Sequence, residues 1–582
     1  MAERKKLVIA GAATVGAALG VYVMIRRSKK ASSSAPTAPT YSVSYEPTAA
    51  DRERWAARMA EASTEDDAPD PTTAAEPVRE LWRLYAKLRD LLLRASPSDA
   101  SMYGDNRFGH LLTDLSKAAF DALVADVKAF QKELAAAVPS GVAALPESEH
   151  GNYAFLSEMV DLTLKKLASF QCYEVPTNQL FGPHLELVPV VTQFSPKDTA
   201  EDLRDLLHRL RGFPKQVDEM IAAFRVGVER GRTLPPSSID AMVAQCKSMY
   251  DGKTFADSPF AAMATFADGS KEESAEGAAA ADGGGVDGGA FAAAAEAAVT
   301  GEVMPAFEKL ATFLAEEYKP HARATAGLAG WDGGAEIYAS AVQYFTSLPS
   351  ATAEEVHAMG LEEVARIRTE MAALIEEHGE AMLTTEAGRA RGLSSGGGKK
   401  TSTIADFMQA LKEDPTQAPA DGEEIVRMYR EILVEAERVS REGVQEGEGL
   451  TAAAQPPLFT EKSRPKAAYE VKAVEPFREK HAPPAFYYPP AADGSRGGIF
   501  YANTYLAETR GKFVMESIAL HEAIPGHHFQ IAIAQELAGM PWLRKQVQDF
   551  CTAYIEGWGL YTEKLGLEMG FYTDPCQDFG EF

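Results

Sequence analysis

The stretch FVMESIALHEAIPGHHFQIAIAQEL covers residues 513–537 and carries an apolar helical pattern with a break in its middle. A His-Glu pair at 521–522 ends the first half, Pro-Gly follows at 525–526, and helical periodicity resumes with two more histidines at 527–528. Three histidines within eight residues stand out in a chain that has only 11. Because histidine is the commonest protein ligand of metal ions, the stretch predicts a metal site at a helix break, with histidines that cap a turn as the structural alternative.

The spacing of these histidines selects the predicted ligands. The zinc-peptidase motif H-E-x-x-H places two histidines four residues apart on one helix, but the residue four after His521 is Pro525. In an unbroken helix His521 and His528 would be about 10.5 Å apart, too far for one zinc with bonds of about 2.0–2.1 Å. If Pro525 and Gly526 bulge out, His527 falls where the second ligand belongs. We therefore predict His521 and His527 as ligands, and His528 as an alternative ligand or a supporting donor.

Glu522 directly follows the first predicted ligand. In the logic of H-E-x-x-H, this carboxylate takes the proton of a metal-activated water, so Glu522 is the predicted general base. A salt-bridged surface glutamate is the alternative.

A third ligand is expected from DFCTAYIEGWGLYTEKLGLEMG, the apolar helical pattern of residues 549–570. A carboxylate inside such a pattern must be paired or bound to a metal, and Glu556 therefore completes the predicted set of ligands. Glu563 lies near the same helical face; it is predicted either to support a ligand or to be a solvated helix charge, and the solvated charge is the favoured interpretation. Tyr561 is a weak candidate for stabilising an oxyanion.

The rest of the chain is predicted to be mainly α-helical with a small β element. Apolar residues recur at steps of three and four in many segments, and strand-like alternation is restricted to YEVKAV (469–474) and GGIFYANT (497–504). Two segments rich in glycine, alanine or serine, about 267–299 and 386–402, are predicted to be low-complexity insertions with loop or disordered structure. The clearest helical segments are 81–95, 114–134, 200–231 and 352–379.

The N-terminus predicts a membrane segment. Residues 7–25, LVIAGAATVGAALGVYVMI, contain no charge and are flanked by basic residues on both sides. As a helix they would be about 28 Å long, close to the hydrocarbon thickness of a bilayer. We predict a single-pass anchor over residues 1–30, with a cleaved secretory or organellar targeting segment as the alternative. Residues 31–75 are rich in Ser, Ala, Pro and Thr and predict a disordered linker, so the helical domain is expected over 76–582.

Charge and cysteine content exclude two classes of protein. The chain has 582 residues and a formal net charge of −26, which argues against a nucleic-acid binder. Its four cysteines are scattered, which favours free thiols over a disulfide scaffold or a thiolate zinc site. Neither quantity predicts an oligomeric state.

Two motifs together make the chain resemble the family called domain of unknown function 885, whose members are similar to gluzincin metallopeptidases. They are HEAIPGHHFQ (521–530) and AYIEGWGLYTEKLGLEMGFY (553–572), with FYANT (500–504) just ahead of them. Weaker similarity lies in 96–116, 333–345 and 357–371, so the resemblance runs from about residue 76 to the end.

The resemblance implies a large helical, gluzincin-like, zinc-dependent fold related to helical carboxypeptidases and dipeptidyl carboxypeptidases. It implies zinc binding by His521, His527 and Glu556, with Glu522 as base and a peptide as substrate. Members of the family continue past the segment that resembles 569–580, whereas this chain stops at Phe582, so the resemblance predicts that the chain is truncated at its C-terminus. The sequence therefore predicts a membrane-tethered zinc metallopeptidase; a catalytically silent helical scaffold that keeps the zinc site, or a zinc hydrolase of non-peptide amides, are the alternatives.

Overall fold

The computed structural model describes residues 49–63, 68–70, 72–266, 288–325, 327–393, 395–396, 399–400, 403–444, 456–546 and 551–582. Residues Ala49–Phe582 form one unit. The predicted membrane anchor at 1–30 lies outside the described residues, as does the linker up to residue 48. Among the residues that are described, no helix combines the length and the apolar character needed to cross a bilayer.

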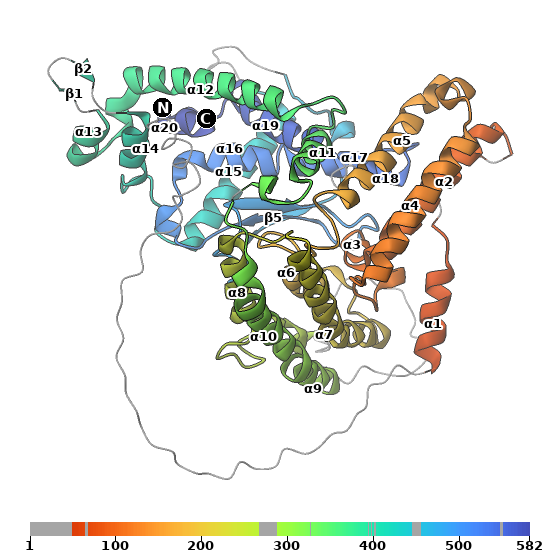
Figure 1. Ribbon diagram of the computed structural model, residues 1–582. Helices are drawn as coiled ribbons and strands as arrows, with labels where there is room; N and C mark the ends of the chain where they lie inside the picture. Colours follow the sequence, from red (N-terminus) through yellow and green to blue (C-terminus); the bar gives the residue numbers. More distant parts are fainter. Residues whose placement is uncertain are drawn as a thin grey trace, which may run out of the picture. The chain divides into compact units, whose positions relative to one another are not determined.

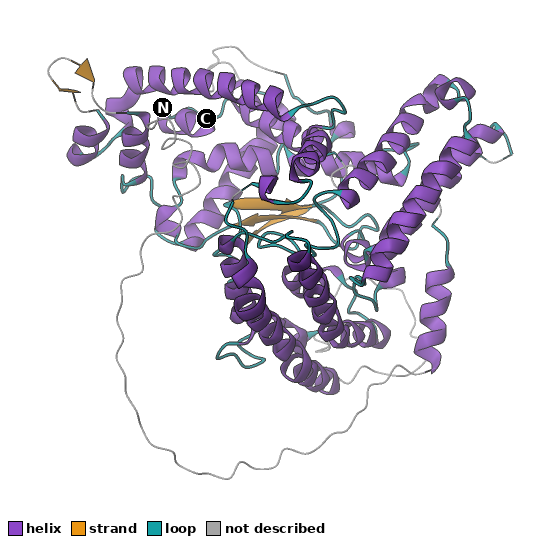
Figure 2. Ribbon diagram, viewed as in Figure 1, coloured by secondary structure: helices purple, strands orange, loops and turns teal. Residues whose placement is uncertain are grey.

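The fold is mainly helical with few strands, as Figure 2 shows. The α-helices are α1 (Ala49–Ala60), α2 (Glu76–Ala95), α3 (Pro97–Met102), α4 (Lys117–Ala137), α5 (Glu147–Ala168), α6 (Pro183–Pro189), α7 (Ala200–Glu229), α8 (Pro236–Tyr250), α9 (Gly288–Ala298), α10 (Met304–Thr312), α11 (Gly334–Thr346), α12 (Ala353–Met382), α13 (Glu386–Gly392), α14 (Ile404–Lys412), α15 (Gly422–Glu442), α16 (Met515–Glu522), α17 (His527–Glu536), α18 (Trp542–Lys545), α19 (Thr552–Glu568) and α20 (Pro575–Glu581). The strands are β1 (Ser395–Gly396), β2 (Lys399–Lys400), β3 (Tyr469–Ala473), β4 (Ala485–Tyr488) and β5 (Gly498–Ala502).

The four segments with the clearest helical periodicity are helices, as predicted: they are α2, α4, α7 and α12. In α2 most of the apolar stripe is buried, and Leu81, Leu84 and Tyr85 are all 0% exposed. The threonines that precede α7 and α12 form capping boxes, in which the side chain of Thr199 accepts from the backbone of Asp202 and Thr352 accepts from Glu355. Periodicity and caps therefore fix these helices locally.

Part of the predicted linker is helical, which corrects the domain boundary. Helix α1 lies within 31–75 and packs against the body through Trp55, whose Nε1 donates to Oδ1 of Asp205 at 2.8 Å. The Trp55 ring also stacks on His110 with 4.3 Å between ring centroids. Arg54 and Arg58 of α1 also pair with Asp205, at 2.7 and 2.5 Å. A buried tryptophan and these ion pairs therefore anchor a helix that its composition did not reveal.

The two predicted low-complexity insertions are also partly ordered. Helix α9 begins inside 267–299, and residues 267–287 of that segment lie outside the described residues. Helix α13 and the two-stranded β1–β2 ladder lie inside 386–402, so the loop interpretation is wrong for those positions. Alanine has the highest helix propensity, which explains why an Ala-rich tract can form α9.

The small β element is a three-stranded mixed sheet in the order β3-β5-β4. β3 runs parallel to β5 with Val471 opposite Phe500, and β4 runs antiparallel to β5 with Tyr487 opposite the same residue. β3 and β5 confirm the two predicted strands, whereas β4, Ala485–Tyr488, was not predicted. All five residues of the central strand β5 are buried, so both faces of the sheet are covered.

The sheet lies next to the helices that carry the histidine stretch of residues 513–537 (Figure 1). On one face Val471, Phe500 and Ala502 share a buried cluster with residues of α15, α16 and α19. On the other face the hydroxyl of Tyr501 donates to Gln193 at 2.6 Å, in the segment that follows α6. The sheet thus packs against α16.

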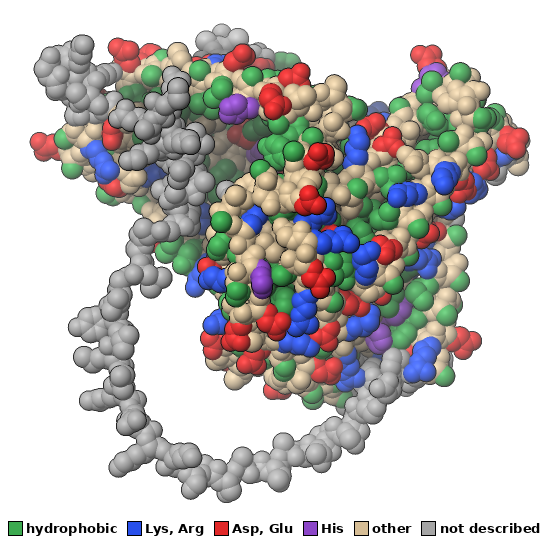
Figure 3. All heavy atoms as spheres, viewed as in Figure 1, with side chains coloured by type: hydrophobic (Ala, Val, Ile, Leu, Met, Phe, Trp, Pro, Cys, Tyr) green, Lys and Arg blue, Asp and Glu red, His purple; other side chains and the backbone are tan. Residues whose placement is uncertain are grey.

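Surface charge is mixed. In the face shown in Figure 3, acidic and basic side chains alternate, and the described surface there gathers no continuous basic patch. All four cysteines are free, as predicted.

Candidate metal centre

The break in the histidine stretch separates two helices. α16 ends at Glu522 and α17 begins at His527, with Pro525 and Gly526 between them. A Cβ on Gly526 would lie 1.9 Å from the carbonyl oxygen of His521, so this close turn requires glycine. The Nε1 of Trp558 donates to the Pro525 carbonyl at 2.9 Å and holds the turn from α19. The predicted bulge is therefore a complete helix break.

This break brings His521 and His527 together. Their ring centroids are 4.6 Å apart and the rings are nearly perpendicular, at 87°. Both side chains are largely shielded from solvent, with 17% and 10% exposed respectively. Two imidazoles from two successive helices therefore face one small volume, as the spacing argument predicted.

Helix α19 supplies the carboxylate. Oε2 of Glu556 lies 3.4 Å from Nε2 of His521, and its Oε1 lies 3.9 Å from Nε2 of His527. The side chain of Glu556 is 53% exposed, so solvent reaches this side of the cluster. The helix can approach so closely because Gly559 has no side chain: a Cβ there would be 2.5 Å from Cε1 of His521.

The donor set of His521, His527 and Glu556 fits a metal ion. One ligand atom of each residue lies within 4.8 Å of those of the other two. Ligands of a tetrahedral zinc with bonds of about 2.0–2.1 Å are about 3.4 Å apart, and the two histidine–glutamate pairs, at 3.4 and 3.9 Å, are at or slightly beyond that separation. Nδ1 of His527 is buried with no hydrogen-bond partner among the described residues. Two imidazoles and one carboxylate are a donor set that zinc accepts, and three protein ligands leave a further position open.

Glu563 supports a ligand, which is the less favoured of the two interpretations that the sequence offered. Its Oε1 lies 2.6 Å from Nδ1 of His521, and only 19% of its side chain is exposed. The interpretation of Glu563 as a solvated charge is therefore wrong. A carboxylate on Nδ1 fixes the ring so that Nε2 points to the other ligands. The sequence contained a signal for this contact, because Glu563 follows Glu556 by two helical turns on the same face of α19.

His528 points elsewhere. Its Nδ1 lies 2.8 Å from the hydroxyl of Tyr487, and its ring lies 4.6 Å from that of Tyr469. It also has a backbone hydrogen bond with Ala467, and burial lowers its pKa to about 4. The structure thus places His528 against β3 and β4, and it does not bring His528 into the cluster of ligands.

The cluster strongly perturbs its titrating groups. For His521, burial disfavours the charged ring, but hydrogen bonds to Glu556 and Glu563 outweigh burial and raise its pKa to about 10. Burial and the nearby charge of His521 lower the pKa of His527 to about 4. The pKa values of the two rings are thus shifted in opposite directions, by burial for His527 and by the hydrogen-bonded carboxylates for His521.

The side chain of Glu522 is partly buried and partly accessible to solvent. Burial raises its pKa to about 7, the charge of His521 opposes this shift, and the carboxylates of Glu556 and Glu563 add to it. A carboxyl group with a pKa near neutrality can both accept and return a proton at physiological pH.

Tyr561 lies on the exposed side of α19. It is 54% exposed, and its ring lies 5.6 Å from that of Trp558. Tyr554 and Leu560 on the same helix are also exposed, at 58% and 62%. The described ring contact of Tyr561 is thus with Trp558 rather than with the ligand cluster, and its role in oxyanion stabilisation stays a prediction.

The fold and the cluster define a mainly helical protein with a His-His-Glu centre built from a broken helix pair and one crossing helix. The chain belongs to the family described as bacterial protein of unknown function (DUF885), whose sequence model matches residues 97–582. Helices α1 and α2 precede the matched region.

Two solved structures have a similar fold. One is described as "the putative lipoprotein from Colwellia psychrerythraea": it has a TM-score of 0.70 and 21% identity over 87% of this chain and 81% of that chain. The other is described as "a putative lipoprotein of unknown function from Shewanella oneidensis", with a TM-score of 0.52 and 17% identity over 87% of this chain and 80% of that chain. At these identities the likeness concerns the fold. A comparison with curated proteins returns no match.

Proposed function

We propose that this chain is a zinc-dependent metallopeptidase with a carboxypeptidase-like or dipeptidyl carboxypeptidase-like activity. The observation that carries the proposal is the convergence of His521, His527 and Glu556, whose ligand atoms lie within 4.8 Å of one another. The resemblance of the two motifs to gluzincin relatives supports a peptide as the substrate. Glu563 would hold the ring of His521 in the orientation that binds metal.

When bound, zinc supplies Lewis-acid polarisation of a carbonyl oxygen and lowers the pKa of water. The protein contributes the proton transfers. Glu522, with its pKa raised to about 7, would accept a proton from the attacking water and return it to the leaving amine. Glu556 faces solvent with 53% of its side chain, which leaves an approach for an extended substrate.

The experiment that tests the proposal uses the full chain and the Glu522→Gln variant. Both are supplied with zinc and incubated with a library of short peptides, whose products are identified by mass spectrometry. Because the amide cannot accept the proton, we expect turnover to fall about 10²–10⁴-fold in Glu522→Gln while one zinc stays bound. Glu508→Gln, on an exposed residue, is the matched control and should keep full turnover.

Two results would contradict the proposal. Full hydrolysis by Glu522→Gln would remove Glu522 as the base. Zinc binding by the unaltered chain without hydrolysis of any peptide would favour a catalytically silent helical scaffold that keeps the metal site.

We further propose that residues 1–30 anchor the protein in a membrane as a single-pass segment. The uncharged run at 7–25 with basic flanks supports this, and the description of both similar structures as lipoproteins points to membrane attachment in relatives. The full chain should stay with membranes after alkaline carbonate extraction, and the chain starting at residue 31 should not. Release of the full chain would favour the cleaved targeting segment.

A further inference from the structure

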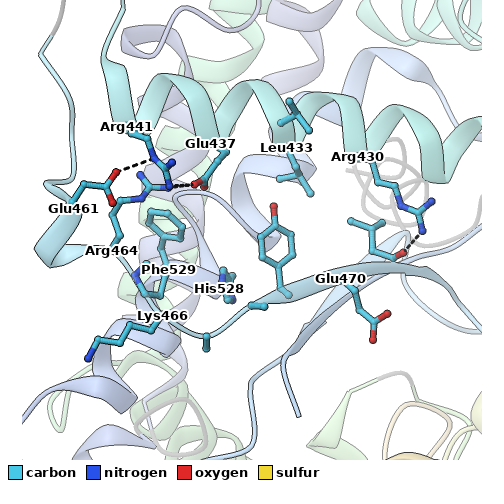
Figure 4. Close-up of a pocket in the computed structure, with 16 residues that line it drawn as sticks. Arg430, Leu433, Glu437, Arg441, Glu461, Arg464, Lys466, Glu470, His528 and Phe529 are labelled. Carbon is cyan, nitrogen blue, oxygen red and sulfur yellow. Dashed lines mark hydrogen bonds and ion pairs between the residues drawn. The ribbon is translucent and has the colours of Figure 1, made fainter. Parts of the chain in front are cut away.

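Helix α17 presents two of its faces to different neighbours. On one face His528 and Phe529 line a groove between β3 and α15, as Figure 4 shows. On another face Nε2 of His527 lies 3.9 Å from Oε1 of Glu556, and the side chain of Gln530 contacts the backbone of α19. His527 and Gln530 therefore share the side of α17 that faces α19 and the metal cluster.

The amide of Gln530 is oriented by its contact with α19. Its Nε2 donates to the carbonyl oxygen of Tyr554 at 3.2 Å. Because a carbonyl oxygen can only accept, the amide nitrogen must face Tyr554 and the amide oxygen must point elsewhere. This oxygen, Oε1, is buried and has no hydrogen-bond partner among the residues that the structure describes. Gln530 therefore holds an unused acceptor on the face of the helix that carries His527.

His527 has the complementary need. Its Nδ1 is also buried, and it has no hydrogen-bond partner in the described part of the chain. A neutral imidazole carries one proton, so a metal on Nε2 leaves that proton on Nδ1. A buried N–H without an acceptor is destabilising. Metal binding by His527 thus requires an acceptor at Nδ1.

The spacing of the two residues allows a contact. His527 and Gln530 lie three residues apart in α17. Residues at this spacing are neighbours on a helix surface, with Cβ atoms about 5–6 Å apart, which is within the reach of a glutamine amide. A change in the side-chain torsions of Gln530 is therefore enough to bring Oε1 to Nδ1, and the backbone need not move.

We propose that Oε1 of Gln530 accepts a hydrogen bond from Nδ1 of His527 when Nε2 of that ring binds zinc. Gln530 is then a positioning residue for His527, as Glu563 is for His521. Because the same amide donates to Tyr554, it ties the second predicted ligand to the helix that supplies the third. This inference rests on the metal centre of the proposed function and not on a peptide as the substrate.

The first test is zinc affinity, measured on the full chain by competition with a chelating dye. Gln530→Ala removes the acceptor, and we expect the affinity to fall about 10–100-fold. Gln535→Ala is the matched control, because Nε2 of Gln535 in the same helix also donates to a backbone carbonyl, that of Pro490, at 3.2 Å. This control should bind zinc within about twofold of the unaltered chain. Thermal melting of the apo variants shows that they are folded.

A further variant separates the acceptor of Gln530 from its donor. Gln530→Glu keeps an oxygen that can accept from Nδ1 of His527 but loses the N–H that donates to Tyr554. Because a carboxylate is the stronger acceptor, we expect this variant to bind zinc at least as tightly as the unaltered chain. Zinc binding as weak as that of Gln530→Ala would show that the contact with Tyr554 determines the affinity, and it would overturn the proposal.

Nuclear magnetic resonance of the zinc-loaded chain, labelled with ¹⁵N in its histidines, observes the hydrogen bond itself. We expect an Nδ1–H signal that exchanges slowly with water, that is absent from His527→Gln, and that loses this protection in Gln530→Ala. A signal that Gln530→Ala leaves unchanged would contradict the proposal.

The results also distinguish this inference from the metal centre on which it rests. If the unaltered chain binds zinc and Gln530→Ala binds it equally well, Gln530 does not position His527, and the metal centre is unaffected. If the unaltered chain binds no zinc, the metal centre and the role of Gln530 are both overturned.

Discussion

Oε1 of Glu563 lies 2.6 Å from Nδ1 of His521, and the same helix places Glu556 beside Nε2 of that ring. Helix α19 thus contacts both ring nitrogens of His521, Nδ1 through Glu563 and Nε2 through Glu556. The ring is fixed before any metal binds, which reduces the conformational entropy that binding must overcome.

The first prediction concerns this contact. Glu563→Ala removes the carboxylate that orients His521, and we expect zinc affinity to fall about 10–100-fold. Competition with a chelating dye measures the affinity. Glu568→Ala, an exposed glutamate of the same helix, is the control and should bind zinc normally. Equal affinity of the two variants would show that Glu563 does not position the ring.

The second prediction concerns the close approach of α19. Gly559→Ala places a methyl group 2.5 Å from Cε1 of His521, so the helix or the ring must shift and zinc affinity should fall at least tenfold. Gly557→Ala has nothing within 4 Å of its added Cβ and should stabilise the helix by up to about 1 kcal/mol without affecting zinc. The pair is compared by zinc titration and by thermal melting. Similar behaviour of both variants would contradict the observed packing.

The third prediction tests the position of His528. Tyr487→Phe leaves Nδ1 of His528 buried without its partner, which should cost about 1–3 kcal/mol of unfolding free energy and leave zinc affinity unchanged. Tyr561→Phe removes an exposed hydroxyl and should leave stability unchanged. Urea unfolding and zinc titration separate the two effects. Loss of zinc by Tyr487→Phe would mean that His528 acts on the metal after all.

The fourth prediction is a pH dependence that arises far from the metal centre. His184 is 1% exposed, and its ring nitrogens lie 2.9 Å from Oγ1 of Thr177 and 3.1 Å from Oε1 of Gln245. Burial lowers its pKa to about 4, against the opposing bond to Gln245. The unfolded chain binds this proton first, near pH 6.5, so stability is complete above pH 6.5 and decreases as the pH falls to about 4. The full effect is about 3 kcal/mol.

Urea unfolding at pH 7, 5.5 and 4 checks this dependence. His184→Gln should lose part of the decrease below pH 6.5, whereas His357→Gln, an exposed histidine, should follow the unaltered chain. Identical pH profiles of all three proteins would contradict the assignment.

The sequence was sufficient where local chemistry determines the structure. Periodicity located α2, α4, α7 and α12, and the Pro525–Gly526 pair located the helix break. The same pair identified His527 rather than His528 as the partner of His521, because only a break shortens the distance between the rings. Glu556 was selected by its place in an apolar pattern. Its side chain is 53% exposed, so its position beside His521 and His527, and not burial, supports it as a ligand.

Contacts between distant segments could not be predicted from local sequence patterns. The ordered α1 depends on Trp55 meeting Asp205, which lies 150 residues away. The role of Glu563 depends on a ring 42 residues earlier. β4 was missed because its four residues, AFYY, carry no alternation of apolar and polar side chains. In each case tertiary packing decides a structure that the local pattern leaves open.

Zinc content is the most direct measurement of the central claim, that His521, His527 and Glu556 bind one metal ion together. Isothermal titration with zinc, supported by elemental analysis, is performed on the apo chain and on His521→Ala, His527→Ala, Glu556→Ala and His528→Gln. The account predicts one site per chain, abolished or weakened at least about 10²-fold in the first three variants and kept in the fourth. Absence of a site in the unaltered chain, or full zinc binding by any of the first three variants, would contradict it.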